Sequence, residues 1–179
     1  MTTPNKKNLP LEPELENLNA DIWSISIPKD WQECTSEKNG QIYFKSSDGT
    51  KGIYVLVLNL HIDDKHYINE ITEEQRSISR HSLNEMSNSG YRWSLLADEH
   101  RVQGLVYELL FDNYDPARRY RIIDKVLISL PFLMRVAFHD YECSNIATSD
   151  KYFRPIMESV KLLGERQEGM DKESGISSR

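Results

Sequence analysis

Residues 119–140, RYRIIDKVLISLPFLMRVAFHD, decide the fold class of this chain. Two apolar-rich runs, 119–130 and 132–140, meet at Pro131. Alternation of apolar and other side chains with a period of two is typical of a β-strand that buries one face. In the second run the alternating positions are Phe132, Met134, Val136 and Phe138. The stretch therefore predicts two neighbouring antiparallel strands that bend at Pro131.

Further strands are predicted on both sides of this pair. The residues Asp115-Pro-Ala117 predict a turn that joins a strand at 103–114 to the strand at 119–130. Gly49 suits the tight turn at 47–50, because glycine adopts positive φ readily. The segment 52–60 is apolar on both faces, so we expect it to be central and covered on both sides. The remaining predicted strands are Trp23–Ile27, Gln41–Ser46 and Tyr91–Leu95.

Two segments change to the helical period. Over 63–89, Ile68, Ile71, Ile78 and Met86 recur at helical spacing, and Gly90 is expected to end the helix. A closing helix is predicted from the spacing of Phe153, Ile156, Met157 and Val160. Pro155 fits best at the first turn, so this helix is expected at 154–163.

The order of these elements predicts a single α+β domain, with a mostly antiparallel sheet of five to seven strands and helices packed on it. The folded unit is expected to cover residues 21–163. Residues 1–20 are interpreted as a flexible leader, with at most a short helical turn at 15–18. Residues 164–179 have no apolar period and are interpreted as a disordered tail.

Composition narrows the function classes. The net charge is −6, and phosphate binding needs a basic surface, so nucleic acid and anionic membranes are disfavoured as partners. The chain begins without an apolar signal region and has no apolar run of membrane-spanning length, which predicts a cytoplasmic protein. Cys34 and Cys143 form no motif and are expected to be two reduced thiols.

Residues 61–66, HIDDKH, bring imidazoles and carboxylates close together in sequence. A tetrahedral metal site needs three or four convergent ligands. Asp63 and Asp64 are natural helix caps, so the segment is interpreted as a solvated loop before a helix, with no metal. No cofactor is predicted either, because the glycines are scattered and form no phosphate-binding loop.

Catalytic motifs are weak. No Gly-x-Ser-x-Gly motif is present, and neither cysteine has a local histidine signature, so the chain is predicted not to be an enzyme. One enzymatic alternative stays open, a site built from Glu108, Arg135 and His139 on one sheet face. Glu108, Lys125 and Arg135 fall on neighbouring strands, where salt pairs across a solvated face are the simpler interpretation.

Two exposed features are predicted to contact a protein partner. One is the hairpin tip with Tyr114, Arg118, Arg119, Tyr120 and Arg121; the other is the loop with His61, Asp63 and Asp64. Tyrosine and arginine are enriched at interface hot spots, and recognition residues are common on loops held by a rigid sheet. The alternative is that these residues only keep a turn soluble.

Three segments, in order, resemble the PsbP-like superfamily: WSISIPKDW at 23–31, YFKSSDG at 43–49 and FRPIMESVKL at 153–162. The resemblance covers about residues 21–163; Pro155 departs from the pattern. It implies an α+β layered fold and a non-enzymatic binding role. The superfamily includes PsbP, the Ran-release factor Mog and the Eag-type chaperones of type VI secretion.

The resulting hypothesis is a non-catalytic protein-binding module, first of all an immunity protein that neutralises a cognate bacterial toxin. An acidic surface would steer association with a basic toxin. The alternatives are an Eag-type chaperone for a secreted effector, which would need a large exposed apolar groove, and an adaptor like PsbP or Mog. A homodimer is left open.

Overall fold

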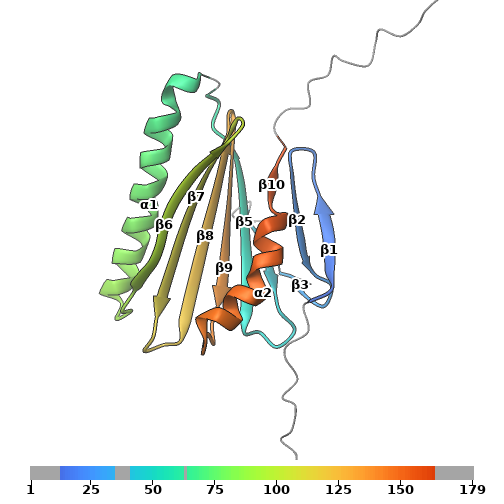
Figure 1. Ribbon diagram of the computed structural model, residues 1–179, viewed down its shortest axis with the longest axis vertical. Coiled ribbons are helices and arrows are strands. Elements are labelled where there is room, and N and C mark those ends of the chain that lie inside the picture. Colours follow the sequence, from blue (N-terminus) through green and yellow to red (C-terminus); the bar gives the residue numbers. More distant parts are fainter. Residues whose placement is uncertain (1–12, 35–40, 63, 164–179) are drawn as a thin grey trace, which may run out of the picture.

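The computed structural model describes residues 13–34, 41–62 and 64–163. The large antiparallel sheet has seven strands in the order β3-β4-β5-β9-β8-β7-β6, and a small sheet has the order β1-β2-β10. Figure 1 shows the two helices on opposite faces of the large sheet. This is an α+β architecture, as the sequence predicted. The elements are β1 (Leu15–Asn19), β2 (Trp23–Pro28), β3 (Gln32–Glu33), β4 (Ile42–Lys45), β5 (Lys51–Asn59), the 3₁₀ turn η1 (Lys65–Tyr67), α1 (Ile68–Asn88), β6 (Ser94–Gln103), β7 (Val106–Asp115), β8 (Tyr120–Ser129), β9 (Phe132–Asp140), α2 (Ile146–Ser159) and β10 (Lys161–Leu162).

The strand pair predicted from 119–140 is confirmed. β8 and β9 are antiparallel, with Ile123 opposite Phe138 and Ile128 opposite Leu133. β9 also pairs with β5 along its whole length, which places both strands inside the sheet. No helix in the described ranges is long and apolar enough to cross a membrane.

The main core lies between the large sheet, α2 and β2. It buries one face of β5, β8 and β9 through Ile53, Val55, Ile123, Leu127, Met134, Val136 and Phe138. α2 contributes Phe153 and Ile156, and β2 contributes Ile25 and Ile27. Burial of such side chains, each contributing about 1.5–3 kcal/mol, holds the small sheet against the large one.

α1 covers the opposite face over β6, β7 and β8 (Figure 1). Its first turns bury Ile68 and Ile71 against Phe111, Val126 and Leu133. Gly90, at φ 88°, ends the helix as predicted. Ile78 was expected on the buried stripe but is 39% exposed, because Ser79 faces the sheet in its place.

The prediction for β5 is confirmed as to position and wrong as to covering. Ile53 and Val55 are buried on the α2 side. On the α1 side Tyr54 and Leu56 are only half-buried and Leu58 is 42% exposed. The reason is that α1 lies over β6–β8 and leaves β4 and β5 uncovered on this face.

The interpretation of residues 15–18 as part of a flexible leader is wrong. Leu15–Asn19 is a strand paired with β2, with Leu18 opposite Ile25, and no helical turn of a leader forms there. Backbone pairing and the partial burial of Leu15 and Leu18 offset the polar composition of this segment. Residues 1–12 and 164–179 lie outside the described ranges.

The closing helix begins earlier than predicted. Asn145 caps α2, accepting a hydrogen bond from the backbone N–H of Thr148 at 2.9 Å, and Pro155 lies inside the helix. Burial of Phe153 and Ile156 on either side of Pro155 offsets the lost backbone hydrogen bond. β6 is also longer than the predicted 91–95 strand and runs to Gln103.

Candidate functional site

The two features predicted to bind a partner lie at opposite ends of the sheet. The loop after β5 is beside the start of α1, and the β7–β8 turn is beside its end (Figure 1). His61 is exposed at φ 55°, and Asp64 caps η1 by accepting from the backbone N–H of His66. Asp63 lies outside the described residues. The structure therefore does not bring the two features together.

The hairpin residues also divide between the two faces of the sheet. Arg118 and Arg119 are exposed in the turn. Tyr114 and Arg121 point to the α2 side, where the Tyr114 hydroxyl donates to the carbonyl of Cys143 at 3.2 Å. Tyr120 lies on the α1 side and contacts His139.

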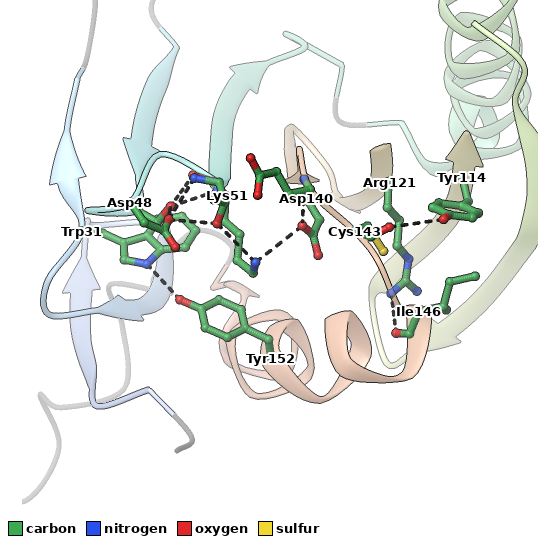
Figure 2. Close-up of polar contacts among 12 residues, drawn as sticks. Trp31, Asp48, Lys51, Tyr114, Arg121, Asp140, Cys143, Ile146 and Tyr152 are labelled. Carbon is green, nitrogen blue, oxygen red and sulfur yellow. Dashed lines mark hydrogen bonds and ion pairs between the residues drawn. The ribbon is translucent and has the colours of Figure 1, made fainter. Parts of the chain in front are cut away.

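Arg121 was expected to be an exposed contact residue, and this is wrong, because it is only 2% exposed. Its guanidinium donates two hydrogen bonds to Asp112 and one to Asp150 of α2, and another to the carbonyl of Ile146. Figure 2 shows the side chain directed at α2. Arg121 thus ties the sheet to the helix.

A row of aromatic rings crosses the α1 side of the sheet near the β7–β8 turn. Sequence reasoning did not identify this set as a site. Its neighbouring ring centroids are between 4.2 and 6.0 Å apart. The row, called the aromatic row below, consists of Tyr43, Tyr54, Tyr141, His139, Tyr120, Trp93 and Tyr91, all half-buried.

The backbone makes room for this row. Gly52 lies beneath Tyr43 and Tyr141, and a Cβ at this position would lie 2.8 Å from Cε2 of Tyr43. At the other end, the Arg118 guanidinium stacks on Tyr91 with its central carbon 3.9 Å from the ring centroid. This exposed arginine extends the row into the turn, so part of the predicted hairpin tip adjoins it.

Three phenols and the imidazole of the aromatic row are uncharged at physiological pH. Burial raises the pKa of Tyr43, Tyr120 and Tyr141, so their phenols stay protonated. Burial, followed by the nearby charge of Arg135, lowers the pKa of His139 to about 4. The His139 ring is therefore uncharged and lies 2.6 Å, Nδ1 to oxygen, from the Tyr120 hydroxyl.

A groove of about 350 Å³ adjoins the aromatic row at Tyr54 and His139 and runs beneath the second half of α1. We call it the α1 groove. Asp124 and Arg135 pair at its floor, with Arg135 Nε 2.9 Å from a carboxylate oxygen, and Ser79 donates to Asp124 at 3.2 Å. The apolar lining consists of Leu56, Leu83, Met86, Phe111, Ile122 and Ala137.

The enzymatic alternative required Glu108, Arg135 and His139 on one face, and this is wrong. Arg135 lies opposite Val126 on β8, whereas Glu108 forms an ion pair with Lys125 at 3.5 Å. Val126 and Lys125 are successive residues of a strand and point to opposite faces. The expected Glu108–Lys125 pair does form, but Lys125 is only 5% exposed, so this pair is not on a solvated face.

A second cavity, the α2 cleft, has a volume of about 370 Å³ and lies between α2 and the β4–β5 turn (Figure 2). One ion pair, between Lys51 and Asp140, lies in this cleft. Lys51 Nζ lies 3.5 Å from Asp140 and 5.2 Å from the ring centroid of Tyr152, whose hydroxyl accepts from Trp31 Nε1 at 3.1 Å. Asp48 accepts from the backbone N–H and hydroxyl of Thr50, and the first of these bonds is the main cause of its lowered pKa.

Both thiols are free, Cys34 exposed and Cys143 buried. Burial raises the pKa of Cys143, so its thiolate form is less populated at neutral pH. Within the described ranges, no group of three or more His, Cys, Asp or Glu side chains is placed to hold a metal ion.

No family model matches the chain, and no curated protein matches its sequence. Solved structures do match it. The solution structure of cyanobacterial PsbP (CyanoP) from Synechocystis sp. PCC 6803 has a TM-score of 0.64 and 12% identity, over 89% of this chain and 98% of that chain. The fold is PsbP-like. At this identity the likeness establishes the fold alone.

A second similar chain comes from a crystal structure from Bacteroides thetaiotaomicron VPI-5482. It has a TM-score of 0.44 and 13% identity, over 89% of this chain and 50% of that chain. This weaker likeness carries no argument about the fold. The PsbP-like fold shown by the first match confirms the resemblance noted in the sequence.

The signal for the aromatic row was present in the sequence. Tyr43, Tyr54 and Tyr120 lie within a few residues of predicted turns, and Tyr141 directly follows the predicted strand at 132–140. Which face each ring takes depends on strand register, and only the PsbP-like sheet order brings the four together.

Proposed function

We propose that this chain is a non-catalytic protein-binding module that contacts its partner through the aromatic row and the adjoining Arg118. The observation that carries the proposal is the unbroken series of half-buried rings along the α1 side of the sheet, from Tyr43 to Tyr91. Tyrosine, tryptophan and arginine dominate interface hot spots, because they combine large contact area with directional hydrogen bonds.

The chemistry of the described side chains supports binding over catalysis. The His139 ring is bonded to Tyr120, and its lowered pKa makes it a poor base at neutral pH. Cys143 has a raised pKa and a buried side chain, which is the opposite of an activated nucleophile.

The finer form of the proposal is that the partner is a bacterial toxin, which the chain neutralises as an immunity protein. The support is its small size and its net charge of −6, which favours fast association with a basic partner. The alternative is that the chain is an Eag-type chaperone and its partner a secreted effector. The co-expression experiment described below distinguishes these two forms.

The test compares partner capture by the wild-type chain and by a Tyr91→Ala/Arg118→Ala variant. The partner is isolated from a lysate of the source organism, purified, and titrated with each chain. We expect the variant to lose about 2 kcal/mol or more of binding free energy, roughly thirtyfold in affinity. Lys161→Ala, on the exposed side of β10, is the matched control and should bind as the wild type does.

Equal affinity of the folded double variant and the wild type would exclude the aromatic row. Co-expression then separates the finer forms. A toxin partner should stop growth of a bacterial host when expressed alone and be harmless with the wild-type chain. An effector bound by a chaperone should instead gain solubility from the chain.

A further inference from the structure

We propose that the α1 groove receives one tyrosine side chain of the partner protein, with the ring against the apolar lining and the hydroxyl on the Asn113 carboxamide. This inference rests on the proposed function and names the group that enters the groove beside the aromatic row.

The size and lining of the groove suit an aromatic ring. Its volume of about 350 Å³ lies at the small end of the range for ligand pockets. Leu83 and Met86 of α1 form one wall, and Phe111 and Ala137 belong to the sheet. Methionine adapts its shape to an inserted ring and makes favourable sulfur–aromatic contacts.

At the polar end of the groove lies the side-chain carboxamide of Asn113. Asn113 is only 3% exposed and lines the groove. Its side chain forms no hydrogen bond with any residue in the described part of the chain. Its amide atoms are not fully enclosed and face the groove, so a group that enters the groove can bond to them in place of water.

A phenol hydroxyl can form a hydrogen bond with either end of this carboxamide. The amide presents a carbonyl acceptor and N–H donors, and a tyrosine hydroxyl both donates and accepts. A phenylalanine ring would fill the same space and leave Asn113 unbonded, and an indole N–H could only donate.

Charged side chains are a poor match to the groove. The charge of Arg135 is already compensated by Asp124, whose carboxylate also accepts from Ser79. His139 at the edge of the groove is neutral, with a pKa of about 4. An ammonium or carboxylate would lose its hydration without an opposite charge to pair with.

The test uses small analogues of side chains and does not need the partner. Each probe is titrated into the ¹⁵N-labelled chain while its NMR spectrum is followed: 4-methylphenol for tyrosine, toluene for phenylalanine and butylammonium for lysine. We expect saturable shifts at Asn113, Leu83 and Met86 with 4-methylphenol, an affinity about fivefold lower with toluene, and no saturation with butylammonium.

Two variants locate the site. Asn113→Leu should weaken 4-methylphenol about fivefold and leave toluene unchanged or tighter. Ala137→Phe should fill the groove and block both probes, which keeps the test decisive if Asn113→Leu does not fold. Equal affinities of the two aromatic probes for the wild type, or shifts elsewhere in the chain, would overturn the inference. Because the probes act without the partner, such a result would leave the aromatic row to be judged by partner titration alone.

Discussion

The hydroxyl of Tyr120 lies 2.6 Å from Nδ1 of His139, and this contact holds an uncharged imidazole in the middle of the aromatic row. The pKa of His139 is lowered from its ordinary 6.5 to about 4, first by burial and then by Arg135. Protonation of the folded state is therefore disfavoured, and the unfolded chain takes up the proton first as pH falls.

This relationship predicts a pH-dependent loss of stability. The contribution of His139 is fully present above pH 6.5 and is lost as pH falls from about 6.5 to 4, by about 3 kcal/mol at most. Urea unfolding at several pH values measures this loss. His139→Gln, which cannot titrate, should have a flatter profile in this window.

Parallel profiles for the wild type and His139→Gln between pH 4 and 6.5 would contradict the prediction. Asp48 and Asp115, whose pKa values are lowered, do not affect the difference between the two pH profiles. They reduce stability only below their ordinary value of 3.8, and both are present in each protein.

Gly52→Ala should destabilise the fold and disturb the aromatic row. The new Cβ would lie 2.8 Å from Cε2 of Tyr43 and 3.1 Å from the hydroxyl oxygens of Tyr43 and Tyr141. Crowding of this kind costs about 1–3 kcal/mol in unfolding free energy, which chemical denaturation measures. The same substitution in a Tyr43→Ala background is the control, since the nearest ring is then absent. A cost that is the same in both backgrounds would show that the ring contact is not the cause.

Arg121→Met should be among the most damaging substitutions at the hairpin. It leaves Asp112, which is 8% exposed, without the guanidinium, and breaks the tie to Asp150 of α2. Loss of one partner of a buried ion pair costs about 3–5 kcal/mol. Thermal and urea unfolding should show this, whereas Arg119→Met, at an exposed position of the same turn, should stay within about 0.5 kcal/mol of the wild type. Equal stability of the two variants would refute a structural role for Arg121.

Asn145→Ala should remove the cap of α2 and cost about 1 kcal/mol. The Asn145 side chain accepts from the backbone N–H of Thr148 at 2.9 Å. Asn145→Asp keeps an acceptor at the position and should retain the stability of the wild type, as judged by urea unfolding. A helix that truly began at 154 would be indifferent to both substitutions.

Much of the architecture follows from local pattern. The two apolar-rich runs of 119–140, with alternation at 132–138, predicted the central hairpin, since the side-chain period of a strand is two. The turn at Gly49 and the end of α1 at Gly90 were readable because positive φ restricts the residue type. The α+β class and the PsbP-like resemblance follow from the order of such elements.

Only the tertiary structure decided which residues meet. Leu15–Asn19 is polar enough to be mistaken for a leader, yet it gains its hydrogen bonds from β2. Pro155 lies inside α2 because distant core contacts of Phe153 and Ile156 offset a local penalty. The aromatic row joins residues far apart in sequence. Its formation depends on the register and order of the strands, and these are set by pairing between segments that lie far apart along the chain.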